Sequence, residues 1–105
     1  MAFTGREDHT ISLVDASAMT KNYRDTLSSS ADTIAHYFGK DAIQAILNQD
    51  GCVGIRIYYG LNDAGVKQLI VVGTDTSEND LYTGLLAERS VQCPPTCASA
   101  NPLNS

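Results

Sequence analysis

The stretch that most limits how this chain can fold is residues 51–75, GCVGIRIYYGLNDAGVKQLIVVGTD. Two runs of β-branched, aromatic and other apolar residues flank a polar segment, and such runs favour β-strands. In the polar segment, Asn62 and Asp63 can hydrogen-bond to their own backbone, and Gly65 accepts a positive φ. The sequence therefore predicts a β-hairpin with a four-residue loop, Asn62-Asp63-Ala64-Gly65.

The length of this loop determines which side chains share a face of the hairpin. A four-residue loop predicts three cross-strand pairs: Leu61 with Val66, Ile57 with Ile70, and Ile55 with Val72. Because side chains alternate between the faces of a strand, the expected core face carries Val53, Ile55, Ile57, Ile70 and Val72. The opposite face is expected to carry Arg56, Tyr58, Lys67, Leu69 and Val71. A slip of one residue would exchange the faces.

The second face is the candidate binding surface, represented by Arg56, Tyr58, Lys67 and Leu69. A sheet face that meets only water is normally more polar than this one, so we expect something to cover it. The cover is either the chain itself, through its tail or another strand, or a partner. That partner would be a second copy of the chain, another protein or a small molecule.

Composition excludes several classes of function. A chain of 105 residues, 43% hydrophobic and 18% charged, predicts one globular domain over residues 1–105. The net charge is −5 and no basic cluster occurs, so nucleic-acid binding, which depends on neutralising phosphates, is not expected. No apolar run approaches the ~20 residues that span a bilayer, so no membrane association is expected. The N-terminus has no secretory signal pattern, and the expected location is cytoplasmic.

Two or three helices are expected before the hairpin. Ser12 suits an N-cap and Asp15 completes a variant of the capping box, so the first helix should begin there and pack its apolar stripe into the core. A short second helix is predicted over Thr33 to Phe38, with Gly39 just past its end. A third helix should run from about Lys40 to Leu47.

The part of the chain after the hairpin is less regular. Residues 81–92 fit either a strand or a helical turn, and we expect a third, edge strand around residues 85–91. From residue 93 onward, the three prolines of the chain exclude regular structure. The predicted segments are a loose lead-in (1–10), a helical part (11–48), a sheet (49–92) and an irregular tail (93–105). The sequence thus predicts an α+β fold, with two or three N-terminal helices packed on a small antiparallel sheet built on the β-hairpin.

The tail cysteines are the main chemical candidates. Cys93 and Cys97 bracket Pro-Pro-Thr, and they form a disulfide, part of a metal site with Cys52 and a histidine, or a pair of reduced thiols. No second close pair of ligands accompanies them, and the acidic loop 75–80 lacks the glycine and glutamate of a calcium loop. No metal and no cofactor are therefore predicted. No nucleophile motif accompanies His36 and no phosphate-binding loop occurs, so no catalytic residue is assigned and the sequence favours a non-enzyme.

Several segments together resemble a group of small bacterial proteins to which no activity is assigned. The matching stretches are HYFGK at 36–40, GCVGIRIYYGL at 51–61, VVG at 71–73, and the ending AERS…CPP.C…NPLNS. The resemblance extends from about residue 11 to the end and includes the Cys-Pro-Pro-x-Cys tail. It implies that the tail is an evolved part of the fold, and it transfers no functional residue.

These observations predict a small non-catalytic interaction or ligand-binding module that acts through one face of its β-hairpin. A sheet of two or three strands leaves its edges unpaired, so a homodimer formed by a sheet face or edge is expected. The alternative is a thiol-dependent or metal-dependent protein that uses Cys93 and Cys97.

Overall fold

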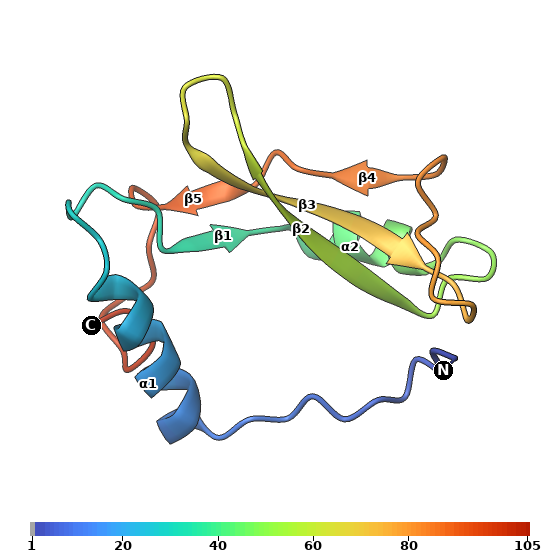
Figure 1. Cartoon of the computed structure of the whole chain (residues 1–105), viewed down its shortest axis with the longest axis horizontal. Coiled ribbons are helices and arrows are strands. Elements are labelled where there is room, and N and C mark those ends of the chain that lie inside the picture. Colours follow the sequence, from blue (N-terminus) through green and yellow to red (C-terminus); the bar gives the residue numbers. More distant parts are fainter. Residues whose placement is uncertain (1) are drawn as a thin grey trace. The chain divides into compact units, whose positions relative to one another are not determined.

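The structure is a computed structural model that describes residues 2–105. Its described residues form two α-helices and two antiparallel sheets, of three and two strands, so the α+β class is as predicted (Figure 1). The chain divides into two compact units. The hairpin unit comprises residues 38–90 with the described part of 1–7, and the tail unit comprises residues 8–37 and 91–105. The single domain over 1–105 stays a prediction.

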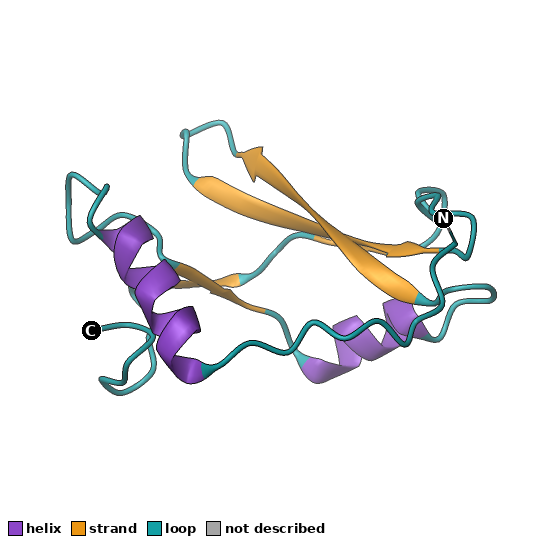
Figure 2. Cartoon of the chain, turned by 60° about the horizontal axis from the view of Figure 1, so that its bottom comes forward, coloured by secondary structure: helices purple, strands orange, loops and turns teal. Residues whose placement is uncertain are grey.

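The hairpin unit is built on a three-stranded antiparallel sheet. Its strands are β2 (Gly54–Leu61), β3 (Lys67–Thr74) and β4 (Leu86–Ala87), in the spatial order β2-β3-β4. Strands β2 and β3 form the predicted hairpin, drawn as a long twisted ribbon in Figure 2. Strand β3 has a neighbour on each side, whereas β2 pairs with β3 and with no other strand of the described residues.

The hairpin loop differs from the predicted four-residue loop. The Asn62 N–H donates to the Val66 carbonyl at 3.1 Å, and the Gly65 N–H donates to the Asn62 carbonyl at 2.9 Å. Gly65 has φ +77°, the left-handed conformation that ends a three-residue hairpin loop. Asn62 therefore pairs with Val66, the loop is one residue shorter than predicted, and the predicted register was wrong by one position. The observed pairs are Leu61 with Lys67, Tyr59 with Leu69, Ile57 with Val71, and Ile55 with Gly73.

The core of the hairpin unit lies where helix α2 (Lys40–Leu47) meets β3. Ile46 and Val71 are each at most 2% exposed, and Val72, also 2% exposed, projects from the opposite face of β3. A Cβ added to Gly73 would lie 3.4 Å from the Ile46 Cγ2 atom, so this helix covers the sheet face on which Gly73 lies. In Figure 1, α2 lies at the end of the hairpin away from its loop. The third predicted helix is thus confirmed with its bounds.

The tail unit contains helix α1 (Leu13–Arg24) and a two-stranded sheet. The Ser12 side chain accepts a hydrogen bond from the Asp15 N–H at 3.1 Å, as the capping pattern predicted. No residue of α1 is fully buried, and Leu13 is 58% exposed, so the expected packing of its apolar stripe into a core was wrong for this residue. Neither helix of the described chain is long and apolar enough to cross a membrane.

The two strands of the tail unit correct the prediction around residues 33–38. In place of a short second helix, Ala35–Tyr37 form strand β1, which pairs antiparallel with β5 (Val91–Cys93). The Ile34 N–H also donates to the Cys93 carbonyl at 2.8 Å. A helix of six residues is too short to be stable alone, and pairing with a distant strand satisfies the backbone instead. Gly39 accordingly is the N-cap of α2 rather than the end of a helix.

The segment around residues 85–91 was also predicted differently. The expected single edge strand is two short strands, β4 and β5, which belong to different sheets. Residues after Cys93 form turns without helix or strand, in agreement with the predicted irregular tail.

Candidate functional site

The most exposed apolar surface of the hairpin unit lies on one face of β2. By the alternation of side chains, this face carries the residues that we call the apolar face of β2: Ile55, Ile57, Tyr59 and Leu61. Tyr59 is 94% exposed and Leu61 is 71% exposed. Both lie in the half of the strand next to the hairpin loop, away from α2. Large apolar side chains that share one exposed face are a common mark of an interaction site.

The four residues of the predicted binding surface do not share one face. Directly opposed residues of an antiparallel pair project to the same side of the sheet. Lys67 pairs with Leu61 and Leu69 pairs with Tyr59, so both lie on the face opposite to Arg56 and Tyr58. The register therefore divides the predicted surface, and Lys67 and Leu69 lie on the same side of the sheet as the apolar face of β2.

Arg56 and Tyr58 meet Asp80 on the other face of the hairpin. The Arg56 guanidinium donates to one Asp80 carboxylate oxygen at 2.5 Å, and the Tyr58 hydroxyl donates to the other. Two further guanidinium contacts reach the Glu78 carbonyl at 3.3 Å, and the guanidinium carbon lies 5.7 Å from the centre of the Phe3 ring. These contacts hold the loop 75–80 against β2.

The hydrogen bonds among Arg56, Tyr58 and Asp80 shift the pKa values of this cluster. The hydrogen bond from Tyr58, together with the Arg56 guanidinium, lowers the pKa of Asp80 below its ordinary value. The same bond to the carboxylate raises the pKa of Tyr58, because ionising the phenol would place two negative charges side by side. With the Asp80 carboxylate bound by both partners, the cluster has the character of a clamp and not of a proton-transfer site.

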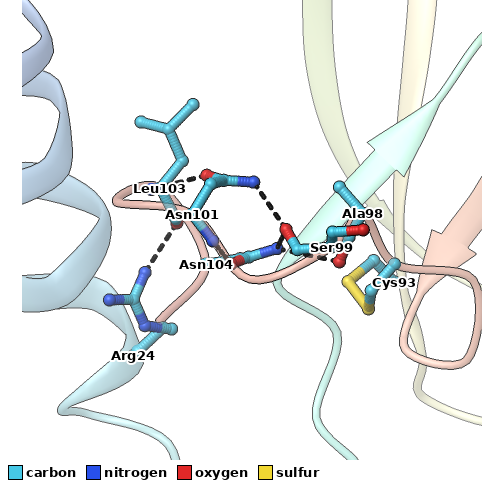
Figure 3. Close-up of a disulfide and its surroundings, with 8 residues drawn as sticks. Arg24, Cys93, Ala98, Ser99, Asn101, Leu103 and Asn104 are labelled. Carbon is cyan, nitrogen blue, oxygen red and sulfur yellow. Dashed lines mark hydrogen bonds between the residues drawn. A yellow bond between two sulfur atoms is a disulfide. The ribbon is translucent and has the colours of Figure 1, made fainter.

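The tail unit has a half-open groove of about 440 Å³ next to its disulfide. Its wall combines apolar and polar groups: Leu27, Ile34, Pro94 and Cys97 with Arg24, Ser28, Ser29, Ser30, Asp32 and Asn104. Figure 3 shows how the last residues of the chain are held beside it. Arg24 donates to the Leu103 carbonyl at 2.7 Å, and the Asn104 amide donates to the Ala98 and Ser99 carbonyls at 3.2 Å.

The predicted thiol pair is joined. Cys93 and Cys97 form a disulfide with their Cα atoms 4.7 Å apart (Figure 3). Cys93 is buried in β5, whereas Cys97 is exposed in the tail. Cys52 belongs to the hairpin unit, where its thiol contacts the Gly54 carbonyl at 3.2 Å. Among residues 2–105, no group of three or more His, Cys, Asp or Glu side chains is placed to hold a metal ion.

His36 lies in β1, and its partial burial lowers its pKa. It pairs with Gln92 across the two strands of the tail unit. His36 belongs to the tail unit and does not lie on the apolar face of β2.

Comparisons with models of protein families, with curated proteins and with solved structures give no significant match.

Sequence reasoning missed Tyr59, Leu61 and Asp80 as residues of interest. The two apolar residues could have been found, because the alternation within β2 alone places them on one face with Ile55 and Ile57. Asp80 could not, since its contact with Arg56 depends on how the loop 75–80 folds back on the strand.

Proposed function

We propose that this protein is a non-catalytic interaction module that binds a protein partner through the apolar face of β2. The observation that carries the proposal is the 94% exposure of Tyr59 beside the 71% exposure of Leu61 on one strand. Leaving such side chains in water forgoes the stabilisation that burial would provide, roughly 1.5–3 kcal/mol for a fully buried large apolar side chain. A partner that covers this face would recover part of it.

The shape of the surface favours a protein over a small molecule as the partner. Small-molecule sites are concave and enclose most of the ligand, whereas these side chains project from an open strand. A second copy of the chain is the partner that we expect from the sequence. We propose that it binds through the apolar face of β2.

Sedimentation velocity over about a hundredfold range of concentration tests this proposal. We expect the wild-type protein to associate, and the Tyr59→Asp variant to weaken association at least tenfold, because a charge would be buried in the contact. Tyr82→Asp is the matched control, since Tyr82 is 74% exposed outside the face and should associate like the wild type. A monomeric wild-type protein that Tyr59→Asp leaves unchanged in mass and stability would overturn the proposal.

A second candidate function is thiol chemistry at the Cys93–Cys97 pair, and the disulfide with one exposed cysteine is the observation that favours it. An incoming thiolate could attack the exposed Cys97 sulfur and displace the Cys93 thiolate, and a second thiol would then release the reduced pair. Disulfides in the cytosol are usually transient and redox-active. The expected cytoplasmic location is therefore compatible with this second function, whereas a purely structural disulfide favours an oxidising compartment.

The redox state of the pair in its own cells separates these possibilities. Thiols are trapped by alkylation at the moment of lysis, and the mass of the protein then shows whether the pair was reduced. A mixture of reduced and oxidised protein that shifts with an added dithiol supports redox activity. A pair that is fully oxidised and resists glutathione supports a structural role and removes the second candidate.

A further inference from the structure

The free edge of β2 carries unpaired backbone groups on the same residues that form its apolar face. In an antiparallel pair, residues alternate between bonding the neighbouring strand and pointing away from it. The Asn62 N–H donates to the Val66 carbonyl, so the backbone of Asn62 points toward the β3 side of the hairpin. Every second residue before it, Gly60, Tyr58 and Arg56, therefore also bonds to β3. The N–H and C=O groups of the residues between them, Ile55, Ile57, Tyr59 and Leu61, therefore point to the free edge.

This edge lacks the features that usually prevent strands from pairing. Proteins protect exposed edges with prolines, lysines or charges that project from the strand. Residues 54–61 contain no proline and no lysine, and the charge of Arg56 is bound by Asp80. Lead-in residue Gly5 lies against the Val53 carbonyl, before the strand begins. No other strand among the described residues pairs with this edge.

We propose that two copies of this chain pair their β2 strands antiparallel, with Tyr58 opposite Tyr58 of the second copy on the two-fold axis. This inference rests on the proposed function and specifies its partner and geometry. The two sheets then join into one continuous sheet. Ile55 lies opposite Leu61 of the second copy, and Ile57 lies opposite Tyr59 of the second copy.

The choice of register follows from hydrogen bonding and charge. Centring the pair on Tyr58 is the alignment that lets all four outward-pointing residues bond to their counterparts. Centring it on Ile57 or Tyr59 leaves one of the four beyond the end of the pair. Centring it on Arg56 would place two guanidinium groups opposite each other, which is destabilising. In the proposed register, Arg56 lies opposite Gly60 of the second copy.

A second copy fits this edge better than an unrelated strand. The strand is self-complementary, because every large apolar side chain meets another apolar one and no like charges meet. A strand paired along this edge would also lie against the flanks of five large side chains, which project from the two faces of the sheet. These five side chains are Ile55, Ile57, Tyr58, Tyr59 and Leu61.

Cysteine cross-linking tests the register. The background is Cys52→Ser, which removes the free thiol. In the proposed pair, residues 58 of the two copies are about 4.5 Å apart at Cα, within disulfide range. Tyr58→Cys should therefore give a covalent dimer under mild oxidation, at a rate at least tenfold above the matched Tyr59→Cys control. The two residues 59 would be about 8 Å apart, beyond that range. Equal rates for the two variants, or cross-linking at 59 alone, would overturn this register.

Hydrogen exchange on the wild-type protein provides a second measurement, because Tyr58→Cys also removes the bond to Asp80. Edge pairing should slow exchange of the Ile55, Ile57, Tyr59 and Leu61 amides as concentration rises. A dimer with these amides unprotected would refute edge pairing but leave the proposed function intact. A monomer at every concentration, unaffected by Tyr59→Asp, would refute both. Open-ended assemblies would refute the closed two-fold dimer.

Discussion

Strands β2 and β3 are equal in length and are joined by one tight turn, yet they meet opposite environments. In β3, Val71 and Val72 are 1% and 2% exposed, whereas in β2 Ile57 is 48% exposed. The difference does not come from apolarity, because both strands are rich in large apolar residues. It comes from position in the sheet: β3 has a strand on each side, whereas β2 lies at the edge, and α2 contacts both strands. The free surface is therefore a property of strand order.

The largest expected effect compares alanine substitutions in the two strands. Val71→Ala should lower the free energy of unfolding by about 2–3 kcal/mol, because it removes buried methyl groups and leaves a cavity. Ile57→Ala removes more atoms but from a half-exposed site, so in dilute protein it should cost less than about 1 kcal/mol. Urea unfolding measures both values. Equal losses would mean that β2 is as buried as β3 in the single chain.

A smaller effect is expected for the glycines of the two strands. A Cβ at Gly73 would lie 2.9 Å from the Cys52 sulfur and 3.1 Å from the Gln49 amide nitrogen. Gly73→Ala should therefore cost about 1–2 kcal/mol through overpacking. At Gly60 the nearest atom, at 2.7 Å, is the end of the Ile70 side chain. That end can rotate away, so Gly60→Ala should stay within about 0.5 kcal/mol of the wild type. If Gly60→Ala proves the more costly of the two, the β2 side of the hairpin is the tighter one.

The smallest expected effect is a pH dependence at the clamp on β2. The pKa of Asp80 is lowered in the folded protein by Tyr58 and Arg56. The resulting stabilisation is thus present above the ordinary pKa of an unfolded aspartate and is lost as pH falls through the lowered pKa. Asp80→Asn should remove this part of the acid-side slope in urea unfolding at a series of pH values. The control Asp63→Asn, in the exposed hairpin turn, should keep it. A slope unchanged in Asp80→Asn would show that the clamp does not form in solution.

The sequence predictions were right where an element depends on residues close together in the chain and wrong where it depends on distant ones. The Ser12–Asp15 cap, the helix Lys40–Leu47 and the two hairpin strands all depend on residues close in the chain, and all three are present. Strand β1 was missed because its partner β5 lies more than fifty residues away. Arg56, Tyr58, Lys67 and Leu69 were assigned to one face through a predicted register that was wrong by one residue, because the loop that ends at Gly65 pairs Asn62 with Val66.

The sequence by itself determined the two hairpin strands, the helix Lys40–Leu47 and which side chains of a single strand share a face, because these depend on local propensity and on the period of two. Only the tertiary structure decided how the faces of β2 and β3 match, which strand lies at the edge, and that Cys93 meets Cys97. Register, strand order and pairing depend on backbone groups finding partners, and several alternatives satisfy the same local pattern. Packing of the whole hairpin unit selects one of them, and that selection leaves the apolar face of β2 exposed.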